Sequence, residues 1–156
     1  MLITLIAVGH KMPAWVEAGY QDHAERLKGG VSLQLKEIPL QKRSDKNQIA
    51  AARQKEDEQI LQTLAQADYI VTLDIPGKVH NSEALAERLQ LWQQQARHLA
   101  LVIGGPEGLS EAVKAKANES WSLGKLTLPH PLVRIIVAEA LYRAWSINQN
   151  HPYHRA

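Results

Sequence analysis

Four apolar runs recur along the chain and predict β-strands. Three of them, residues 2–8 (LITLIAV), 69–73 (YIVTL) and 98–103 (HLALVI), are almost continuously apolar. This pattern is typical of parallel strands that are buried on both faces. The fourth run, 31–38 (VSLQLKEI), alternates apolar and polar positions, which predicts an edge or half-exposed strand. We expect a last short strand within residues 121–128.

Helical patterns lie between the predicted strands. Pro13 suits the first position of a helix, which ends at Gly29 and Gly30. A second helix is expected from Lys46 to Gln66, after a polar, basic segment (residues 41–46) that we expect to be a mobile loop. Ser82 is a natural N-cap for a third helix. Strands that alternate with helices indicate an α/β fold, with a mainly parallel sheet flanked by helices.

The last predicted helix, from Pro131 onward, is apolar almost all round. Its apolar positions are Leu132, Val133, Ile135, Ile136, Val137, Leu141, Trp145 and Ile147. A helix without a large polar face is buried on several sides. One small sheet offers limited cover, so we expect a second subunit to pack here, which predicts a homodimer.

Length and composition narrow the class of protein. The chain has 156 residues, which suits a single domain over 1–156. It contains no cysteine, which excludes disulfides, thiolate metal sites and cysteine nucleophiles, and we expect a cytoplasmic protein. No apolar run approaches the roughly 20 residues of a membrane span, so no membrane partner is expected.

Charge gathers near the C-terminus. The whole chain has a formal net charge of +2. From residue 121 onward, Glu139 is the only acidic residue, against four cations and three histidines: Lys125, Arg134, Arg143, Arg155, His130, His151 and His154. Such a region fits a polyanionic partner, although a solvated basic end explains the charge equally well.

Three predicted strand ends are rich in glycine and proline. They read LDIPGK (73–78), IGGPEG (103–108) and SLGKLTLPHP (122–131). Ligands of open parallel sheets bind beyond the carboxyl ends of the strands, and glycine lets the backbone approach a ligand closely. The segment IGGPEG matches neither the P-loop nor the GxGxxG fingerprint. A tight strand-to-helix turn is the simpler explanation of IGGPEG alone.

Taken together, the motifs carry a resemblance. Four segments are similar to SPOUT methyltransferases with a trefoil-knotted C-terminal half. They are VTLDIPGK, LVIGGPEGLS and SLGKLTLPHPLVRIIVAEALYRAWSI, followed by HPYHR. More closely, the chain resembles the RlmH family, which methylates N3 of a pseudouridine in 23S (large-subunit) ribosomal RNA. The similarity extends from VGHKMPAWV (8–16) to the C-terminus, which is essentially the whole chain.

The resemblance implies a homodimer that acts on the assembled ribosome. It also implies S-adenosylmethionine (SAM) as the methyl donor, bound inside the knot, and no metal. By motif, the SAM pocket would be lined by Leu73, Gly104, Gly105, Leu123, Gly124, Lys125, Leu126, Thr127 and Leu128. The family commonly has serine where this chain has Gly124, so we expect only the backbone to serve there.

Several side chains are candidates for the chemistry. N3 of a pseudouridine carries a proton that must leave, which calls for a positioned base or a site that favours the anion. His130, Glu107 and His154 are candidate bases, and spacing does not choose among them. Arg134 lies in the first turn of the last helix, where the helix dipole disfavours a cation. We therefore expect an anion beside Arg134, either an acidic side chain or an RNA phosphate.

The C-terminal segment HPYHR (151–155) is unusually rich in functional groups for a frayed end. Tyr153 suits stacking on an unpaired base and Arg155 suits a phosphate. We expect this segment to face the RNA and to reach the SAM pocket of a partner subunit. His151 and His154 alone are weak evidence for a metal site.

Two other classes of protein remain open. A non-catalytic ribosome-binding module would bind RNA without affinity for SAM. A flavodoxin-like enzyme acting on a small molecule or nucleotide would need no RNA, and its basic tail would be incidental.

Overall fold

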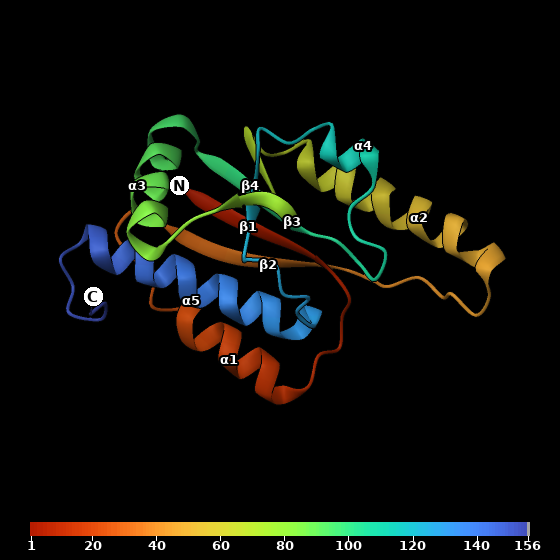
Figure 1. Cartoon of the computed structure of the whole chain (residues 1–156), viewed down its shortest axis with the longest axis horizontal. Helices are drawn as coiled ribbons and strands as arrows, with labels where there is room; N and C mark the ends of the chain where they lie inside the picture. The colour runs from red at the N-terminus through yellow and green to blue at the C-terminus, as the bar shows by residue number, and fades with distance from the viewer. Residues whose placement is uncertain (156) are drawn as a thin grey trace.

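A five-stranded sheet forms the centre of the computed structural model (Figure 1), which describes residues 1–155. The strand order is β2-β1-β4-β3-β5, and every neighbouring pair is parallel. The arrangement confirms the predicted α/β class with a parallel sheet flanked by helices. The strands are β1 (Leu2–Val8), β2 (Ser32–Ile38), β3 (Tyr69–Val79), β4 (His98–Ile103) and β5 (Glu119–Ser122).

Helices cover both faces of the sheet. Residues of α1, α3 and α5 join one hydrophobic cluster with the strands, whereas residues of α2 and α4 join a second cluster on the other face. The same division is visible in Figure 1, where α1 and α5 lie side by side and α2 and α4 lie apart from them. The helices are α1 (Ala14–Ala24), α2 (Lys46–Leu64), α3 (Ser82–Gln95), α4 (Glu111–Lys114) and α5 (His130–Asn148).

Burial along the strands follows the hydrophobic pattern for three of the four predicted runs. Strands β1 and β4 are buried along almost their whole length, and β2 alternates between exposed and partly buried positions at one edge. Strand β3 differs from its predicted run in length, because it does not end at Leu73. It continues to Val79 beside β5, with a register shift between Leu73 and Lys78.

Glycine makes this extension of β3 possible. A Cβ atom on Gly77 would lie 2.7 Å from Ser120 Oγ and 2.9 Å from the backbone carbon of Trp121. No other residue type fits so close to β5. Residues 74–79, which lie beyond the predicted strand, therefore form an irregular extension of β3 with a bulge against edge strand β5.

Some predicted helix ends need correction. Asn81, not Ser82, caps α3, because its side chain accepts a hydrogen bond from the Ala84 amide at 2.7 Å. Pro13 precedes the first helical residue instead of occupying it. Helix α5 begins one residue before Pro131, at His130.

The buried stripe of α2 contains one carboxylate. Ala52, Glu56, Ile60 and Leu64 are buried at intervals of four residues, and Glu56 is only 4% exposed. Its partner is Arg43, from the segment that we predicted to be mobile. The Arg43 side chain is bound between two carboxylates and largely buried, whereas most other residues of the segment are exposed. The mobility of the segment stays a prediction.

The chain itself covers most of α5. Val137, Ala138, Leu141 and Ala144 are fully buried, and α5 packs on both α1 and α3. The most exposed large apolar side chains of α5 are Leu132 and Ile136 in its first half, and Trp145 and Ile147 in its second half are partly buried. Within the described residues, no helix combines the length and the hydropathy needed to cross a membrane.

Edge strand β5 is anchored to α3 through Glu119. Arg88 donates hydrogen bonds to both Glu119 oxygens, and the fully buried Trp92 donates its indole N–H to Oε1. Loss of the carboxylate would leave two buried or half-buried donors without this acceptor.

We therefore predict that Glu119→Ala lowers the free energy of unfolding by about 2 kcal/mol, because buried donors lose their acceptor. Urea denaturation monitored by Trp fluorescence measures the change. Glu87→Ala, which removes an exposed carboxylate from α3, is the matched control. Its free energy of unfolding should stay within about 0.5 kcal/mol of the wild-type value. Equal stability of the two variants would contradict the anchoring role.

Candidate functional site

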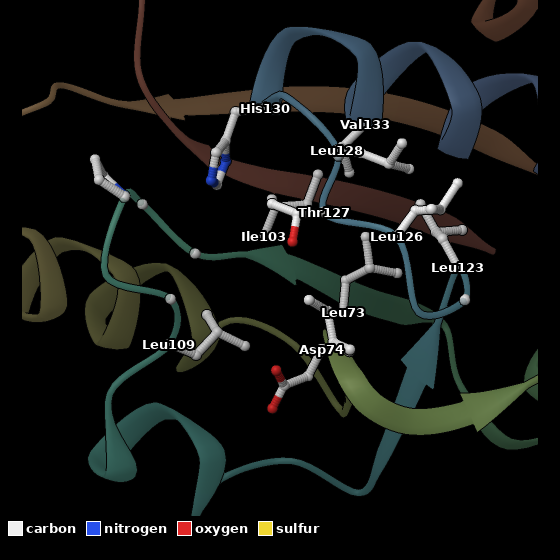
Figure 2. Close-up of a pocket in the computed structure, with 16 residues that line it drawn as sticks. Leu73, Asp74, Ile103, Leu109, Leu123, Leu126, Thr127, Leu128, His130 and Val133 are labelled. Atoms are coloured by element: carbon white, nitrogen blue, oxygen red, sulfur yellow. The ribbon is translucent and has the colours of Figure 1, made fainter.

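A cavity of about 270 Å³ lies beyond the carboxyl ends of β4, β3 and β5. These strands are neighbours in the sheet, so the three Gly- and Pro-rich segments that follow or end them meet at one edge. Figure 2 shows the cavity between Leu73 on one side and His130 on the other. The structure therefore brings together the three segments that we predicted to form a ligand site.

Most of the residues predicted to bind the cofactor line this cavity. Lys125 is the exception, since it is exposed and does not line the cavity. The predicted residues that do line it are Leu73, Gly104, Gly105, Leu123, Gly124, Leu126, Thr127 and Leu128. Leu126 is 77% exposed, which places an apolar side chain at the mouth.

Sequence reasoning missed several lining residues. Asp74 supplies a carboxylate, which pairs with Lys114 at 3.6 Å between Oδ2 and Nζ. Its position directly after Leu73 was the available signal. The other missed residues are apolar or lack a side chain and complete the walls: Ile75, Ile103, Pro106, Gly108, Leu109 and Val133.

Gly104 is required by the loop itself. A Cβ atom there would lie 2.5 Å from the carbonyl carbon of Gly108 and 2.8 Å from the Leu109 amide nitrogen. The loop closes on itself, and the Gly108 amide donates to the Gly105 carbonyl at 2.9 Å. We expected these glycines to admit a ligand, but at Gly104 the close approach is made by the protein backbone.

Gly105 also differs from its expected role. A Cβ atom there would point at Val8 Cγ1, at 3.3 Å, and at Glu56 Oε1, at 3.7 Å. A side chain at this position would therefore press on the end of β1 and on α2. The backbone of Gly105 borders the cavity, but its missing side chain faces the other way.

His130 reaches the cavity from the start of α5 (Figure 2). Its Nδ1 atom is buried and has no hydrogen-bond partner among the described residues. Burial lowers the pKa of His130 below its usual value of 6.5, the backbone of Gly105 opposes this shift, and Arg134 adds to it. His130 is therefore a neutral imidazole near neutral pH, and its unpartnered Nδ1 is buried in this arrangement.

Arg134 lies behind this histidine and is 2% exposed. Its Nη1 donates to Glu37 Oε2 on β2 at 2.9 Å, while Nε and Nη2 lack partners within the described chain. Of the two anions that we considered, the structure supplies the acidic side chain. Burial keeps the guanidinium away from any RNA phosphate in this arrangement.

Tyr20 of α1 shares this buried region. Desolvation raises the pKa of Tyr20 to about 12, and the charge of Arg134 opposes the shift. Tyr20 thus remains a neutral phenol, and the ion pair between Arg134 and Glu37 joins α5 to β2 beside it.

Glu107 does not line the cavity, although it lies between two residues that do. Its Oε1 accepts a hydrogen bond from Arg43 Nε at 2.5 Å. The same guanidinium donates to both oxygens of Glu56, at 2.6 Å each. A carboxylate held by a guanidinium outside the cavity is poorly placed to act as the base.

None of the C-terminal residues 151–155 lines the cavity of their own chain. Tyr153 packs on Tyr142, with ring centroids 4.6 Å apart, and its hydroxyl donates to Glu139 at 3.1 Å. His154 contacts Glu83 and Arg143, and Arg155 is exposed. The segment folds back along α5 as far as Glu139, which is nine residues, or roughly 13 Å along a helix, from His130.

The described residues include no cluster of three or more His, Asp or Glu side chains able to hold a metal ion. In particular, His151 and His154 do not share a third ligand. The cavity offers a ligand its backbone groups, its apolar walls and the side chains of Asp74 and His130.

The fold and the cavity together define a small α/β protein with a ligand site at the carboxyl ends of its parallel strands. A family model described as "Predicted SPOUT methyltransferase" matches residues 1–154. The chain therefore belongs to the SPOUT methyltransferase family and is a methyltransferase, which confirms the resemblance noted in the sequence. Enzymes of this family take their methyl group from SAM.

Individual relatives agree with the family assignment. A "Ribosomal RNA large subunit methyltransferase H" from Dichelobacter nodosus (strain VCS1703A) is 70% identical over 156 residues, which is 100% of both chains. Among solved structures, a probable methylase family protein from Haemophilus influenzae Rd KW20 matches with a TM-score of 0.57 and 14% identity, covering 99% of this chain and 70% of that one. A probable methyltransferase from Bordetella pertussis Tohama I matches with a TM-score of 0.55 and 17% identity, covering 92% and 95%. The two structures support the fold alone.

The lowered pKa of His130 predicts a pH dependence of stability. The unfolded chain binds a proton at this imidazole more readily than the folded chain, so acid favours unfolding as the pH falls below about 6.5. When the pH is lowered from about 7.5 to about 5.5, the free energy of unfolding should therefore fall less for His130→Gln than for the wild type. Urea denaturation at the two pH values measures the difference.

Thr127→Ala changes another cavity residue without removing a titratable group, and should keep the wild-type pH dependence. An unchanged pH dependence in His130→Gln would show that the imidazole is not desolvated as described.

Proposed function

We propose that this methyltransferase transfers a methyl group from SAM to N3 of a pseudouridine in the large-subunit ribosomal RNA. It acts as a homodimer on the assembled ribosome in the cytoplasm. The observation that carries the proposal is the cavity built from the three motif segments, combined with 70% full-length identity to a ribosomal RNA large subunit methyltransferase. The trefoil knot implied by the resemblance stays a prediction.

The residues of the cavity fit SAM. Leu73, Leu126 and Leu128 offer apolar walls of the kind that suit an adenine ring, and the glycine-rich loop offers backbone groups for its polar edge. Asp74 is a carboxylate in reach of the hydroxyl or ammonium groups of such a ligand. SAM supplies a methyl group on a positively charged sulfur, ready for transfer to a nucleophile.

His130 is the best placed of the three candidate bases. It lines the cavity and holds an unpartnered ring nitrogen, and its lowered pKa keeps it neutral. A neutral imidazole is able to accept the N3 proton as the new bond to carbon forms. Glu107 is held by Arg43 outside the cavity, and His154 lies at the other end of α5.

The homodimer rests on two features of the described chain. Exposed apolar side chains occur on two helices that pack together: Trp15 of α1 is 58% exposed, and Leu132 and Ile136 of α5 are 38% and 36% exposed. The terminal segment also carries side chains suited to RNA, and none of them lines the cavity of its own chain. A second copy would bring Tyr153, His154 and Arg155 to a SAM cavity.

Two measurements separate this function from the rival classes. Isothermal titration with SAM tests the proposal against a ribosome-binding module without catalytic activity, which would show no SAM affinity. Methyl transfer with and without ribosomes tests it against an enzyme for small molecules. Mass spectrometry of the modified ribosomal RNA then identifies the methylated position, and a product other than N3-methylpseudouridine would contradict the proposed specificity.

We predict that a chain stopped after Asn150 binds SAM with nearly wild-type affinity, because every cavity residue remains. Methyl transfer to ribosomes should fall by about 100-fold or more, since losing a base stack and a phosphate contact together removes several kcal/mol of RNA binding. Loss of the packing on Tyr142 should lower stability only modestly. Filter assays with ribosomes and titration with SAM measure the two effects separately.

A full-length Tyr153→Ala/Arg155→Ala variant keeps the chain length and should show the same loss of transfer. Wild-type transfer by the shortened chain would place the whole active site within residues 1–150.

We also predict that Ile136→Asp converts the dimer into a monomer, because it buries an unpaired charge in the proposed interface. Sedimentation at micromolar concentration measures the change. Leu91→Asp alters an apolar residue of similar exposure on α3 and should leave the dimer intact. A wild-type protein that sediments only as a monomer would refute the dimer.

A further inference from the structure

Arg43 joins three segments that are distant in the sequence. It lies in the connection between β2 and α2, and its guanidinium contacts Glu56 on α2 and Glu107 in the connection between β4 and α4. Nη1 also donates to the Gln41 carbonyl at 2.9 Å, and the Gln41 amide donates to Glu56 Oε2 at 2.8 Å. Both oxygens of Glu56 are thereby occupied.

Burial makes these contacts strong. The side chains of Arg43, Glu56 and Glu107 are 12%, 5% and 22% exposed. Hydrogen bonds between charged groups in such surroundings are about twice as strong as neutral ones, and the planar guanidinium fixes its partners in direction. The cluster is therefore rigid, and its geometry is passed on to the segments that carry it.

The segment that carries Glu107 is the wall of the SAM cavity. Pro106 and Gly108, its neighbours on both sides, line that cavity, while Glu107 points out of it toward Arg43. The loop is compact, because the backbones of Gly104 and Gly108 lie in contact, so a shift of Glu107 is passed on to its neighbours. The direction of the Glu107 side chain thus sets how Pro106 and Gly108 face the ligand.

We infer that Arg43 is a positioning residue for SAM: by holding Glu107 outside the cavity, it keeps the loop of residues 104–109 in the conformation that receives the cofactor. This role rests on the proposed binding of SAM in the cavity. It assigns a function in cofactor binding to the connection between β2 and α2, which contributes no residue to the cavity. It also makes Glu107 a tether and not a base.

Glu107→Gln is the sharpest test, because it keeps the shape of the side chain and the pair between Arg43 and Glu56. SAM affinity, measured by isothermal titration, should weaken roughly tenfold, since a charge-assisted hydrogen bond becomes a neutral one. The rate at saturating SAM and ribosomes should stay near wild type, and its pH profile should keep its shape. A base would instead lose rate and alter the pH profile.

A second measurement needs no cofactor. In the free protein, hydrogen exchange of the Gly108 amide, which donates to Gly105, should speed up in Glu107→Gln if the tether holds the loop. Arg43→Gln should show the same changes more strongly, with lower stability because Glu56 loses its partner. Arg43→Lys should restore part of the SAM affinity, since an ammonium keeps the charge but not the fork.

Arg53→Gln is the matched control. Arg53 lies beside the same cluster, but within the described residues it has no ion pair with it, so its loss should change neither SAM affinity nor Gly108 exchange. Wild-type SAM affinity and exchange in a folded Glu107→Gln would overturn the inference while leaving the proposed function intact. Absence of SAM binding by the wild-type protein would overturn the proposed function itself.

Discussion

Parallel pairing of all five strands is the constraint from which the rest of this structure follows. Parallel neighbours cannot be joined by a hairpin, so each connection must cross over the sheet and carries a helix or a long turn. Those crossovers cover both faces, which explains why β1 and β4 are buried almost throughout. The same constraint places every carboxyl end at one edge, where the segments around Leu73, Gly104 and Leu126 meet.

Three arginines tie the helices and loops to this sheet through carboxylates. Arg88 holds edge strand β5 to α3 through Glu119, and Arg134 holds α5 to β2 through Glu37. Arg43 holds the loop after β4 to α2. Each pair spans elements far apart in sequence and is largely or partly buried, so its loss would leave a desolvated charge. Such pairs favour one arrangement of the elements over others.

The cavity combines rigidity with few polar groups. Its loop after β4 is closed by backbone contact at Gly104, and β3 is bent at Gly77 against β5. Apolar walls and backbone groups then surround two titratable side chains, Asp74 and His130. Burial keeps His130 neutral, which suits a proton acceptor beside a methyl donor that carries positive charge.

The sequence by itself determined the strands, the α/β class, the three segments of the cavity and the family. It could do so because buried parallel strands are continuously apolar, and because rigid loops need Gly and Pro at set positions. Only the tertiary structure decided which charges pair. Nothing local marks Glu107 as a partner of Arg43, or Glu37 as the partner of Arg134, since both pairs form between segments that the strand order brings together. For the same reason β3 ran past its predicted end at Leu73. Its continuation is held by contact with β5, a neighbour about 50 residues away along the chain.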